Sequence, residues 1–415
     1  VQGINMLVPH AFFYSTDGIR KTESPPSLFF QNGYWKYFKQ YADYVKRLSY
    51  IGRCGEFCPD AAVYFPVETS WAEYRPLYRF SLHELDEQLL LLTECLNENG
   101  VCFDFLNDYG IETKLSGKCG IDDEKCGYKS IILPFTSVMS EKTLVKLTEF
   151  AGNGGYVVSV GDFSPVDENG LKSELYEKTL QNLIACDNFV VFKKHREEEA
   201  AISVVEKLGL SLGKNVKGVF LLKRKDVNRE IDFLVNATGE EKAFTVKRKG
   251  YSGAEIWNAE NGEITPANYT KRGGETTVYV RLRPYGSVIV AFSDDCGKPR
   301  AEVYEKIIAD VTENWIVKES GKEVERANFF AAGKQNFSGE VTFTKRIKIE
   351  KPGGKVMLGL ENVQSYTSVK INGGFAGAKL WSPYEFDVTA NLKNGENTIE
   401  ITVGSTEENA MTGSN

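Results

Sequence analysis

Residues 81–105 read SLHELDEQLLLLTECLNENGVCFDF, and this stretch decides the class of fold. Leucines recur at spacings of three and four residues, which predicts a helix with one apolar face: Leu82, Leu85, Leu89, Leu92 and Leu96. Ser81 and Glu84 have the spacing of a capping box at its start, and Gly100 is typical of a helix end. The apolar run 101–105 that follows predicts a buried strand.

The same alternation of strand and helix extends on both sides of this stretch. Apolar runs predict strands at residues 61–67, 130–134 and 156–160, and periodic patterns predict helices at residues 34–53 and 140–151. Near-continuous apolar strands that alternate with helices are typical of a parallel sheet covered on both faces. We therefore expect a doubly wound α/β domain over residues 61–195.

The pattern changes after residue 195, where short alternating strands separated by turn residues predict antiparallel sheets. We expect an antiparallel β module over residues 196–298. Residues 299–415 are expected to form a linker followed by a β-sandwich, with strands at 340–349, 355–360, 368–371 and 399–403. The chain is thus predicted to be multidomain, with α/β and β parts.

Residues 1–60 form a region of their own in this division. Residues 4–8 (INMLV) predict a buried strand, and because such a strand needs neighbours we expect the chain to be a piece of a longer protein. In a barrel of alternating strands and helices, the segment after a strand lines the active site. His10, Tyr14 and Arg20 in this segment are therefore candidates for hydrogen bonds to sugar hydroxyls, and a packed surface loop is the alternative.

The composition excludes several classes of protein. The 415 residues include 50 Lys and Arg against 57 Asp and Glu, a net charge of −7, which is typical of globular proteins and argues against a nucleic-acid partner. No run of about 18 apolar residues occurs, so no membrane partner is expected. No P-loop, G-x-S-x-G or H-E-x-x-H motif is present, and we expect neither a cofactor nor a metal.

The eight cysteines lack the paired C-x2-C spacing of a zinc ribbon. Cys95 and Cys102 lie in apolar patterns and are expected to be core residues. Cys119 and Cys126 flank an acidic turn, where they are either bridged or free. Scattered cysteines in a chain of this size favour a reducing compartment such as the cytoplasm.

Two groups of acids have the residue types that glycoside hydrolysis needs, which is a pair of carboxyl groups about 5 to 9.5 Å apart. Glu56, Asp60 and Glu68 surround a helix-to-strand junction, and solvated loop charges are the alternative. Asp104 and Asp108 lie at a strand end, where open α/β sheets bind ligands, and a polar loop is the alternative.

Four motifs near the C-terminus occur together: residues 337–343 (FSGEVTF), 369–373 (VKING), 383–389 (PYEFDVT) and 392–399 (LKNGENTI). In order and spacing they resemble the galactose-binding-like, sugar-binding jelly-roll sandwich of glycoside hydrolases of the α-L-rhamnosidase and β-galactosidase types. Trp381 is a candidate for stacking on a sugar ring, and packing is the alternative. The resemblance also makes Asn372 a candidate carbohydrate contact.

The rest of the chain resembles the same enzymes. One set of residues resembles the end of the catalytic (β/α) barrel of α-L-rhamnosidase-like hydrolases: residues 3–5 (GIN), His10, and residues 25–27, 34–35, 44–50 and 63–67. Residues 104–107 and 131–134 are similar to strands of the flavodoxin-like or amidotransferase-like domain that follows, and residues 233–236 and 255–258 to the next β module. Because the catalytic carboxylates of these enzymes precede the position of Gly3, the resemblance assigns no catalytic residue here.

The resemblance implies that the chain is the C-terminal part of a glycoside hydrolase. Such an enzyme uses two carboxylates to cleave glycosidic bonds in complex carbohydrates. Its implied partners are a carbohydrate substrate and the missing N-terminal barrel segment. A non-catalytic carbohydrate-binding or scaffold protein is the alternative. An amidotransferase-like enzyme would need a nucleophilic cysteine with a histidine partner, and Cys102 in a strand and His83 on a helix do not fit that arrangement.

Overall fold

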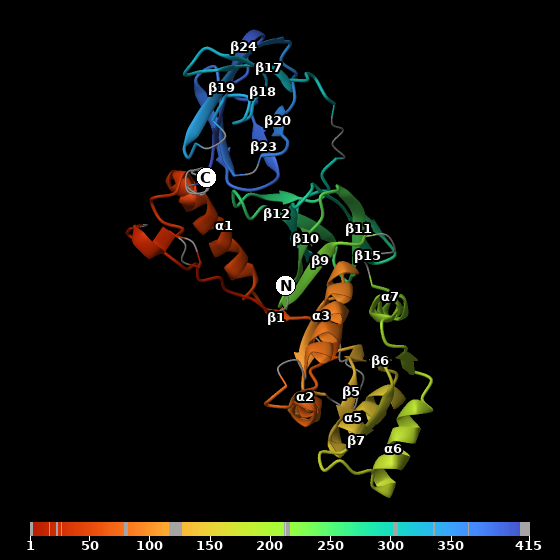
Figure 1. Cartoon of the computed structure of the whole chain (residues 1–415). Coiled ribbons are helices and arrows are strands. Elements are labelled where there is room, and N and C mark those ends of the chain that lie inside the picture. The colour runs from red at the N-terminus through yellow and green to blue at the C-terminus, as the bar shows by residue number, and fades with distance from the viewer. Residues whose placement is uncertain are drawn as a thin grey trace. The chain divides into compact units, whose positions relative to one another are not determined.

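The computed structural model describes residues 3–15, 17–21, 24–25, 27–78, 82–115, 127–210, 212, 216–301, 306–334, 337–363 and 365–406 (Figure 1). It has a mixed α/β fold with several sheets, which confirms the general class expected. The chain divides into two compact units, one comprising Val1–Asn5 and Tyr50–Ala301, and the other Met6–Ser49 and Glu302–Asn415.

A five-stranded parallel sheet with the strand order β3-β2-β4-β6-β8 organises part of the first unit. Its strands are β2 (Ala61–Tyr64), β3 (Phe103–Leu106), β4 (Ser130–Leu133), β6 (Tyr156–Val160) and β8 (Phe189–Phe192). Two short strands, β5 (Thr136–Val138) and β7 (Phe163–Val166), form a separate parallel pair.

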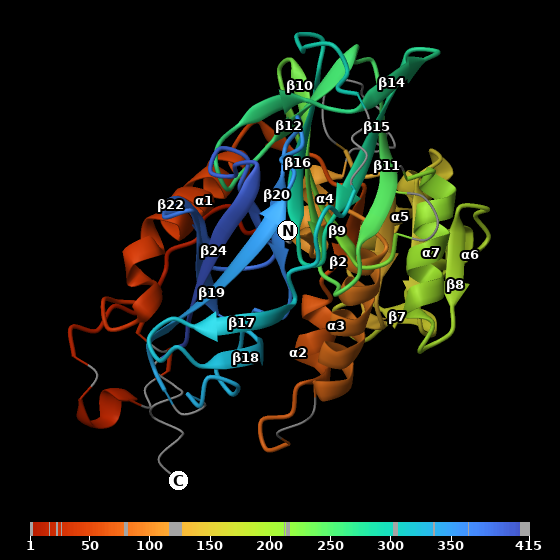
Figure 2. The same cartoon turned by 90° about the horizontal axis from the view of Figure 1, so that it is seen from above.

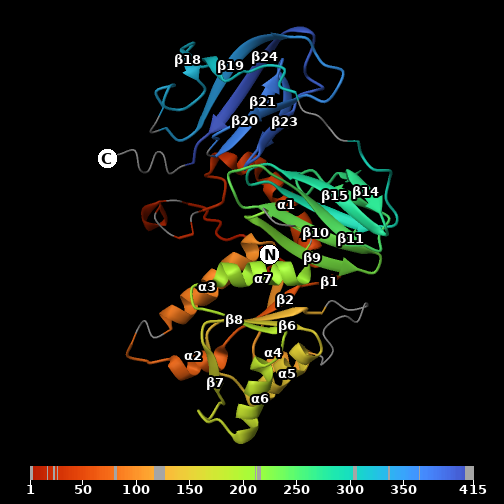
Figure 3. The same cartoon turned by 90° about the vertical axis from the view of Figure 1, so that its right-hand side faces the viewer.

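Helices cover both faces of the parallel sheet (Figure 3). One face carries α3 (His83–Glu98) and α7 (Glu197–Leu208), and the other carries α4 (Asp108–Lys114), α5 (Glu141–Gly152) and α6 (Glu174–Ile184). Successive strand residues point to opposite faces, so Val63 joins the core under α3 and α7 while Ala62 and Tyr64 join the core on the other side. This double burial explains why the strands read as apolar runs.

The remainder of the first unit is an antiparallel β module (Figure 2). The strand order is β1-β9-β10-β16-β12-β13 in one sheet and β11-β15-β14 in the other, and apolar residues of both sheets share one core. The bounds are β1 (Glu56–Phe57), β9 (Val219–Asp226), β10 (Arg229–Asn236), β11 (Lys242–Lys249), β12 (Gly253–Trp257), β13 (Ile264–Pro266), β14 (Tyr269–Arg272), β15 (Glu275–Leu282) and β16 (Ser287–Ser293).

The second unit combines the N-terminal segment with the C-terminal sheets. The N-terminal segment contains the 3-10 helices η1 (Gly18–Lys21) and η2 (Gly33–Tyr37) and most of α1 (Phe38–Ile51). A six-stranded sheet, β18-β17-β19-β24-β21-β22, shares a core with the pair β20-β23. The bounds are β17 (Glu313–Val317), β18 (Glu323–Arg326), β19 (Glu340–Ile349), β20 (Met357–Leu360), β21 (Tyr366–Ile371), β22 (Gly374–Lys379), β23 (Tyr384–Asp387) and β24 (Gly395–Gly404).

Residues 4–8 differ from the expectation of a buried strand. They form no strand, and the side chains of Ile4 and Val8 are 69% and 77% exposed. A buried strand must complete its backbone hydrogen bonds with a neighbour, and none of the strands in the described ranges pairs with this segment. The prediction of a buried strand at residues 4–8 is therefore wrong for this structure.

The helix α7 lies within residues 196–298, where the sequence pattern indicated strands. It begins with three consecutive glutamates, Glu197 to Glu199, and ends at Gly209 in the left-handed conformation (φ 57°). Both features are typical helix boundaries. The first strand of the β module after α7 is β9, which begins at Val219.

Cys58 is disulfide-bonded, whereas Cys54, Cys95, Cys102, Cys186 and Cys296 are free thiols. Cys119 and Cys126 lie outside the described residues. Within the described ranges, the helices all fall short of the length and apolar character that crossing a bilayer requires.

Candidate functional site

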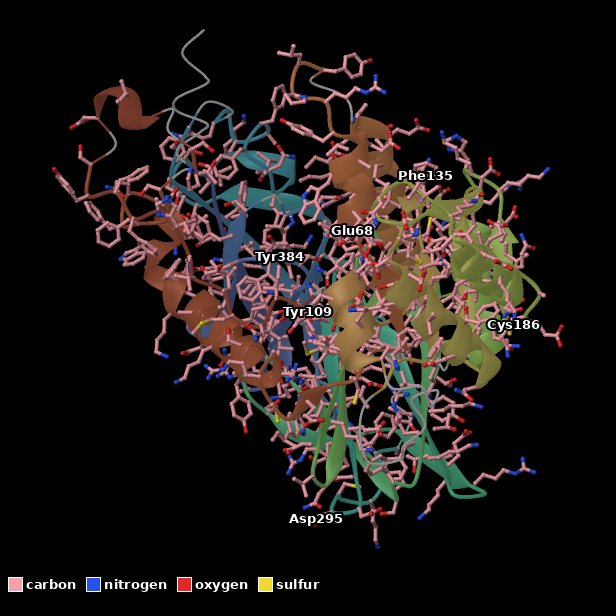
Figure 4. The ribbon with its side chains drawn as sticks, turned by 90° about the horizontal axis from the view of Figure 1, so that it is seen from below. Glu68, Tyr109, Phe135, Cys186, Asp295 and Tyr384 are labelled. Carbon is pink, nitrogen blue, oxygen red and sulfur yellow. The ribbon has the colours of Figure 1, made fainter. Side chains whose placement is uncertain are left out.

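Two acidic residues follow neighbouring strands of the parallel sheet. Strand β2 ends at Tyr64 and leads into α2 (Val67–Glu73), while β3 ends at Leu106 and leads into α4. Tyr64 and Leu106 are partners in the parallel register, so the two helices begin at the same edge of the sheet. Glu68 lies in the first turn of α2 and Asp108 in the first turn of α4. Figure 4 labels Glu68 and Tyr109, the residue that follows Asp108 in the chain. We call Glu68 and Asp108 the acid pair.

Asp108 is held as a buried hydrogen-bond acceptor, with only 4% of its surface exposed. The Tyr64 hydroxyl donates to its Oδ2 at 2.5 Å, and the backbone N–H of Ser140 donates to its Oδ1 at 3.1 Å. Burial acts to raise the pKa of Asp108, but hydrogen bonds from Glu68 and Tyr64 outweigh burial and lower the pKa overall. Asp108 therefore carries the negative charge of the acid pair.

Glu68 has the higher pKa of the two residues. Burial and its contact with the Asp108 carboxylate raise the pKa of Glu68 from 4.5 to about 7. The buried Oε2 of Glu68 has no hydrogen-bond partner among the described residues. The raised pKa allows Glu68 to take up and release a proton near neutral pH.

The acid pair does not have the geometry of the two carboxylates of a glycoside hydrolase. Those groups stand about 5 to 9.5 Å apart with the sugar between them, whereas Asp108 is buried and already accepts hydrogen bonds from Tyr64 and Ser140. Among the residues that the structure describes, no group of three or more His, Cys, Asp and Glu side chains is arranged to hold a metal ion.

The other acids singled out in the sequence have separate partners. Asp60 is buried and forms an ion pair with Lys223 of β9, and Asp104 accepts a hydrogen bond from the Tyr128 hydroxyl at 2.9 Å. Glu56 is an exposed residue of β1. Of these five acids, Glu68 and Asp108 lie in the first turns of two helices that begin at the same edge of the sheet, although the sequence pattern placed them in different groups.

Two of the three residues of the N-terminal segment that were expected to bind sugar lie at its surface. His10 is exposed, and the Tyr14 side chain is 79% exposed. Arg20 lies in η1, and its side chain is outside the described part of the structure. The role of these three residues in substrate binding stays a prediction.

Trp381 is half-buried against α1 within the second unit. Its ring centroid lies 5.0 Å from that of Tyr44 and 6.4 Å from that of Tyr41. Asn372 has a positive φ of 53°, and its Nδ2 donates to the Asn391 carbonyl and to Asn397 Oδ1, both at 2.9 Å. These contacts give both residues a structural role, and their contact with carbohydrate stays a prediction.

Cys102 lacks the features of a catalytic nucleophile. It is 2% exposed, and burial raises the pKa of its thiol to about 12. His83 lies instead on α3, with its Nε2 3.2 Å from Glu87 Oε1. This arrangement agrees with the sequence-based argument against an amidotransferase-like reaction.

Comparison with solved structures gives the fold a context, although no protein-family model and no curated protein matches the chain. The chain is similar to the rhamnosidase from Novosphingobium sp. PP1Y, with 20% identity and a TM-score of 0.58 over 92% of this chain and 38% of that chain. The chain shares its fold with part of that enzyme. It spans 38% of the length of the rhamnosidase, and the remaining 62% has no counterpart in the match.

Weaker matches are also glycoside hydrolases. The β-galactosidase from Bacillus circulans sp. alkalophilus is 13% identical, with a TM-score of 0.42 over 60% of this chain and 44% of that chain. The α-L-fucosidase isoenzyme 2 from Paenibacillus thiaminolyticus is 13% identical, with a TM-score of 0.38 over 63% of this chain and 52% of that chain.

Proposed function

We propose that this chain is part of a glycoside hydrolase of the α-L-rhamnosidase type, which hydrolyses glycosidic bonds in complex carbohydrates. The observation that carries the proposal is the fold shared with the Novosphingobium rhamnosidase over 92% of this chain. The four C-terminal motifs at residues 337–343, 369–373, 383–389 and 392–399 support the same assignment independently, because they are a property of the sequence.

In this proposal the chain supplies accessory modules and part of the pocket wall. Residues 1–60 are the C-terminal remnant of the catalytic barrel, residues 61–195 the α/β domain, residues 196–298 the β module, and residues 299–415 the linker and galactose-binding-like sandwich. His10, Tyr14, Arg20 and Trp381 are the proposed carbohydrate contacts. The catalytic carboxylates belong to the part of the enzyme that corresponds to the unmatched portion of the rhamnosidase.

The assignment of the catalytic carboxylates to another part of the enzyme leads to a direct experiment. We would measure hydrolysis of 4-nitrophenyl α-L-rhamnoside and 4-nitrophenyl β-D-galactoside by the 415-residue chain and by the protein encoded by the complete reading frame that contains it. We expect the complete protein to release nitrophenol from the rhamnoside and the 415-residue chain to release none.

The possible contrary results are distinct. Hydrolysis of the galactoside alone would overturn the rhamnosidase specificity but keep the class of enzyme. Sugar binding by the complete protein without hydrolysis of any aryl glycoside would overturn the enzyme assignment. Turnover by the 415-residue chain that is lost in Glu68→Gln and Asp108→Asn variants would show that the acid pair is catalytic.

A further inference from the structure

We propose that five charged side chains of alternating sign form a joint, through which the parallel sheet with its helices and the antiparallel β module open as one body. We call the parallel sheet and its helices the α/β part. The five side chains, which we call the charge chain, are buried or half-buried and all belong to the first unit: Asp60, Lys223, Asp232, Arg248 and Glu230. This inference does not depend on the proposed glycosidase activity.

The charge chain begins at Asp60, which is fixed to the α/β part. Asp60 precedes β2 and is 3% exposed. Its backbone N–H donates to the Cys102 carbonyl at 2.7 Å, and its carbonyl accepts from the Lys129 amide at 3.0 Å. The Cys102 amide also donates to Asp60 Oδ2 at 3.4 Å. Because Cys102 and Lys129 precede β3 and β4, Asp60 lies at the amino-terminal edge of the sheet, opposite the edge where α2 and α4 begin.

Lys223 of β9 connects this edge to the β module. Its ammonium group forms an ion pair with Asp60 Oδ1, and only 18% of its side chain is exposed. In the antiparallel register, Lys223 lies directly opposite Asp232 of β10. Side chains in such positions point to the same face of a sheet, with Cβ atoms about 4.5–5.5 Å apart. Lys223 therefore lies between two carboxylates, one from the α/β part and one from the β module.

The rest of the charge chain lies inside the β module. Arg248 Nη2 donates to the two carboxylate oxygens of Asp232 at 2.6 and 2.7 Å, and Arg248 Nε lies 3.0 Å from Glu230 Oε2. Asp232 is fully buried, and Arg248 belongs to β11 in the other sheet of the module. Removing one member of a buried ion pair leaves its partner without a compensating charge. The charge chain thus makes the packing of the module depend on the edge of the parallel sheet.

Another lysine at the same boundary provides a comparison. Lys217 Nζ lies 3.3 Å from Glu98 of α3 and 2.8 Å from Glu198 of α7. Its side chain is 57% exposed, so water and salt screen both pairs and they contribute little. We therefore expect the coupling between the two parts to depend on Lys223 and not on Lys217.

Native-state hydrogen exchange of the full chain tests this coupling. Val280→Ala weakens the core of the module, and Val280 is four residues along β15 from Thr276, the residue opposite Arg248. The amide of Val290 reports on the interior strand β16 of the module, and the amide of Val158 reports on the interior strand β6 of the α/β part. If the two parts open together, Val280→Ala should lower both protection factors by the same factor, at least about tenfold.

Two further backgrounds separate the charge chain from other contacts. Asp60→Asn/Lys223→Met removes the boundary ion pair without leaving either charge alone. In this background we expect Val280→Ala to lower the protection of Val290 by the same factor and that of Val158 by less than about twofold. Lys217→Met is the matched control, and there both protection factors should fall together as in the wild type.

Three results would overturn the inference. In the first, Val280→Ala lowers only the protection of Val290 when the charge chain is intact, so the parts are not coupled. In the second, both protection factors fall equally in Asp60→Asn/Lys223→Met, so the coupling does not pass through the charge chain. In the third, Lys217→Met uncouples the parts as strongly as the double variant does.

If the double variant fails to fold, Asp60→Asn alone provides the second measurement. It leaves Lys223 opposite Asp232, so the remaining cation still faces a carboxylate. In Asp60→Asn we expect Val280→Ala to lower the protection of Val158 at least about threefold less than that of Val290. Equal losses would contradict the inference. None of these readouts involves glycoside hydrolysis, so failure here leaves the proposed function untouched.

Discussion

The ring of Tyr366 lies against the backbone of Gly33, since a Cβ atom on Gly33 would lie only 2.1 Å from the Tyr366 hydroxyl oxygen. Tyr366 belongs to β21 and is 1% exposed, so an N-terminal residue closes over a core residue of the C-terminal sheet. Nearby, Lys36 Nζ lies 2.6 Å from Glu340 Oε1. These contacts explain why residues 6–49 form one unit with residues 302–415.

Replacing Gly33 with alanine tests how strongly the N-terminal segment depends on this close approach. The added methyl group overlaps the Tyr366 ring, and we expect Gly33→Ala to cost about 1–3 kcal/mol of stability. Gly354→Ala is the control, because a Cβ there meets nothing within 4 Å, and it should change stability by less than about 0.5 kcal/mol. Urea denaturation measures both, and equal effects of the two variants would refute the clash.

Trp381 provides a second test in the same unit. Because its ring packs against Tyr44, we expect Trp381→Ala to destabilise the unit by about 2 kcal/mol, below the 3–5 kcal/mol typical of a fully buried tryptophan. Trp381→Phe should retain most of the packing, so its stability should lie between that of the wild type and that of Trp381→Ala. Thermal unfolding measures stability, and titration with L-rhamnose measures binding. Unchanged stability with lost sugar affinity would instead assign Trp381 to the carbohydrate.

The buried ion pair of the β module should be sensitive to removal of one partner. Arg248 Nη2 lies 2.6 Å from Asp232 Oδ1, and Asp232 is fully buried. Arg248→Met leaves the Asp232 carboxyl buried without its cation, so we expect a loss of about 3–5 kcal/mol. The exposed pair Arg281–Glu241, at 2.7 Å, is the control, and Arg281→Met should cost no more than about 1 kcal/mol. Similar losses in both variants, measured by chemical denaturation, would contradict this account.

The lowered pKa of Asp108 predicts that the stability of the fold decreases in acid. Its pKa is lowered in the folded state, so it stabilises the fold above its ordinary value of 3.8, and the stabilisation is lost as the pH falls through the lowered pKa. At pH 6 we expect Asp108→Asn to be less stable than the wild type by about 1.5–3 kcal/mol, because charged hydrogen bonds are lost. The difference should shrink below pH 4. Denaturation curves at pH 6 and pH 3 check this, and a difference that persists in acid would argue against a charged Asp108.

Elements with a strong local pattern were predictable from the sequence. The strand at residues 156–160 and the helix after Ser140 were both expected, and the Ser140 hydroxyl accepts a hydrogen bond from the Thr143 amide as a helix cap does. Both follow from the residues within one element, since side-chain period and capping act over a few positions. The three glutamates and Gly209 of α7 are local signals of the same kind. The alternating pattern of the residues that follow α7 nevertheless led to a prediction of strands for the whole region.

The contacts between distant segments were decided by the tertiary structure alone. Glu68 was considered at a helix-to-strand junction and Asp108 at a strand end, but their position at the same edge of the sheet depends on β2 and β3 being neighbours, which no local pattern specifies. Trp381 and Tyr44 likewise meet only because the N-terminal helix joins the C-terminal unit. For residues 4–8, the apolar pattern predicted a buried strand, and this prediction is wrong because a strand also needs a partner for its hydrogen bonds. Sequence thus determined which segments could be helices or buried strands, and only packing decided which of them meet, because contacts between distant segments depend on the arrangement of the sheets.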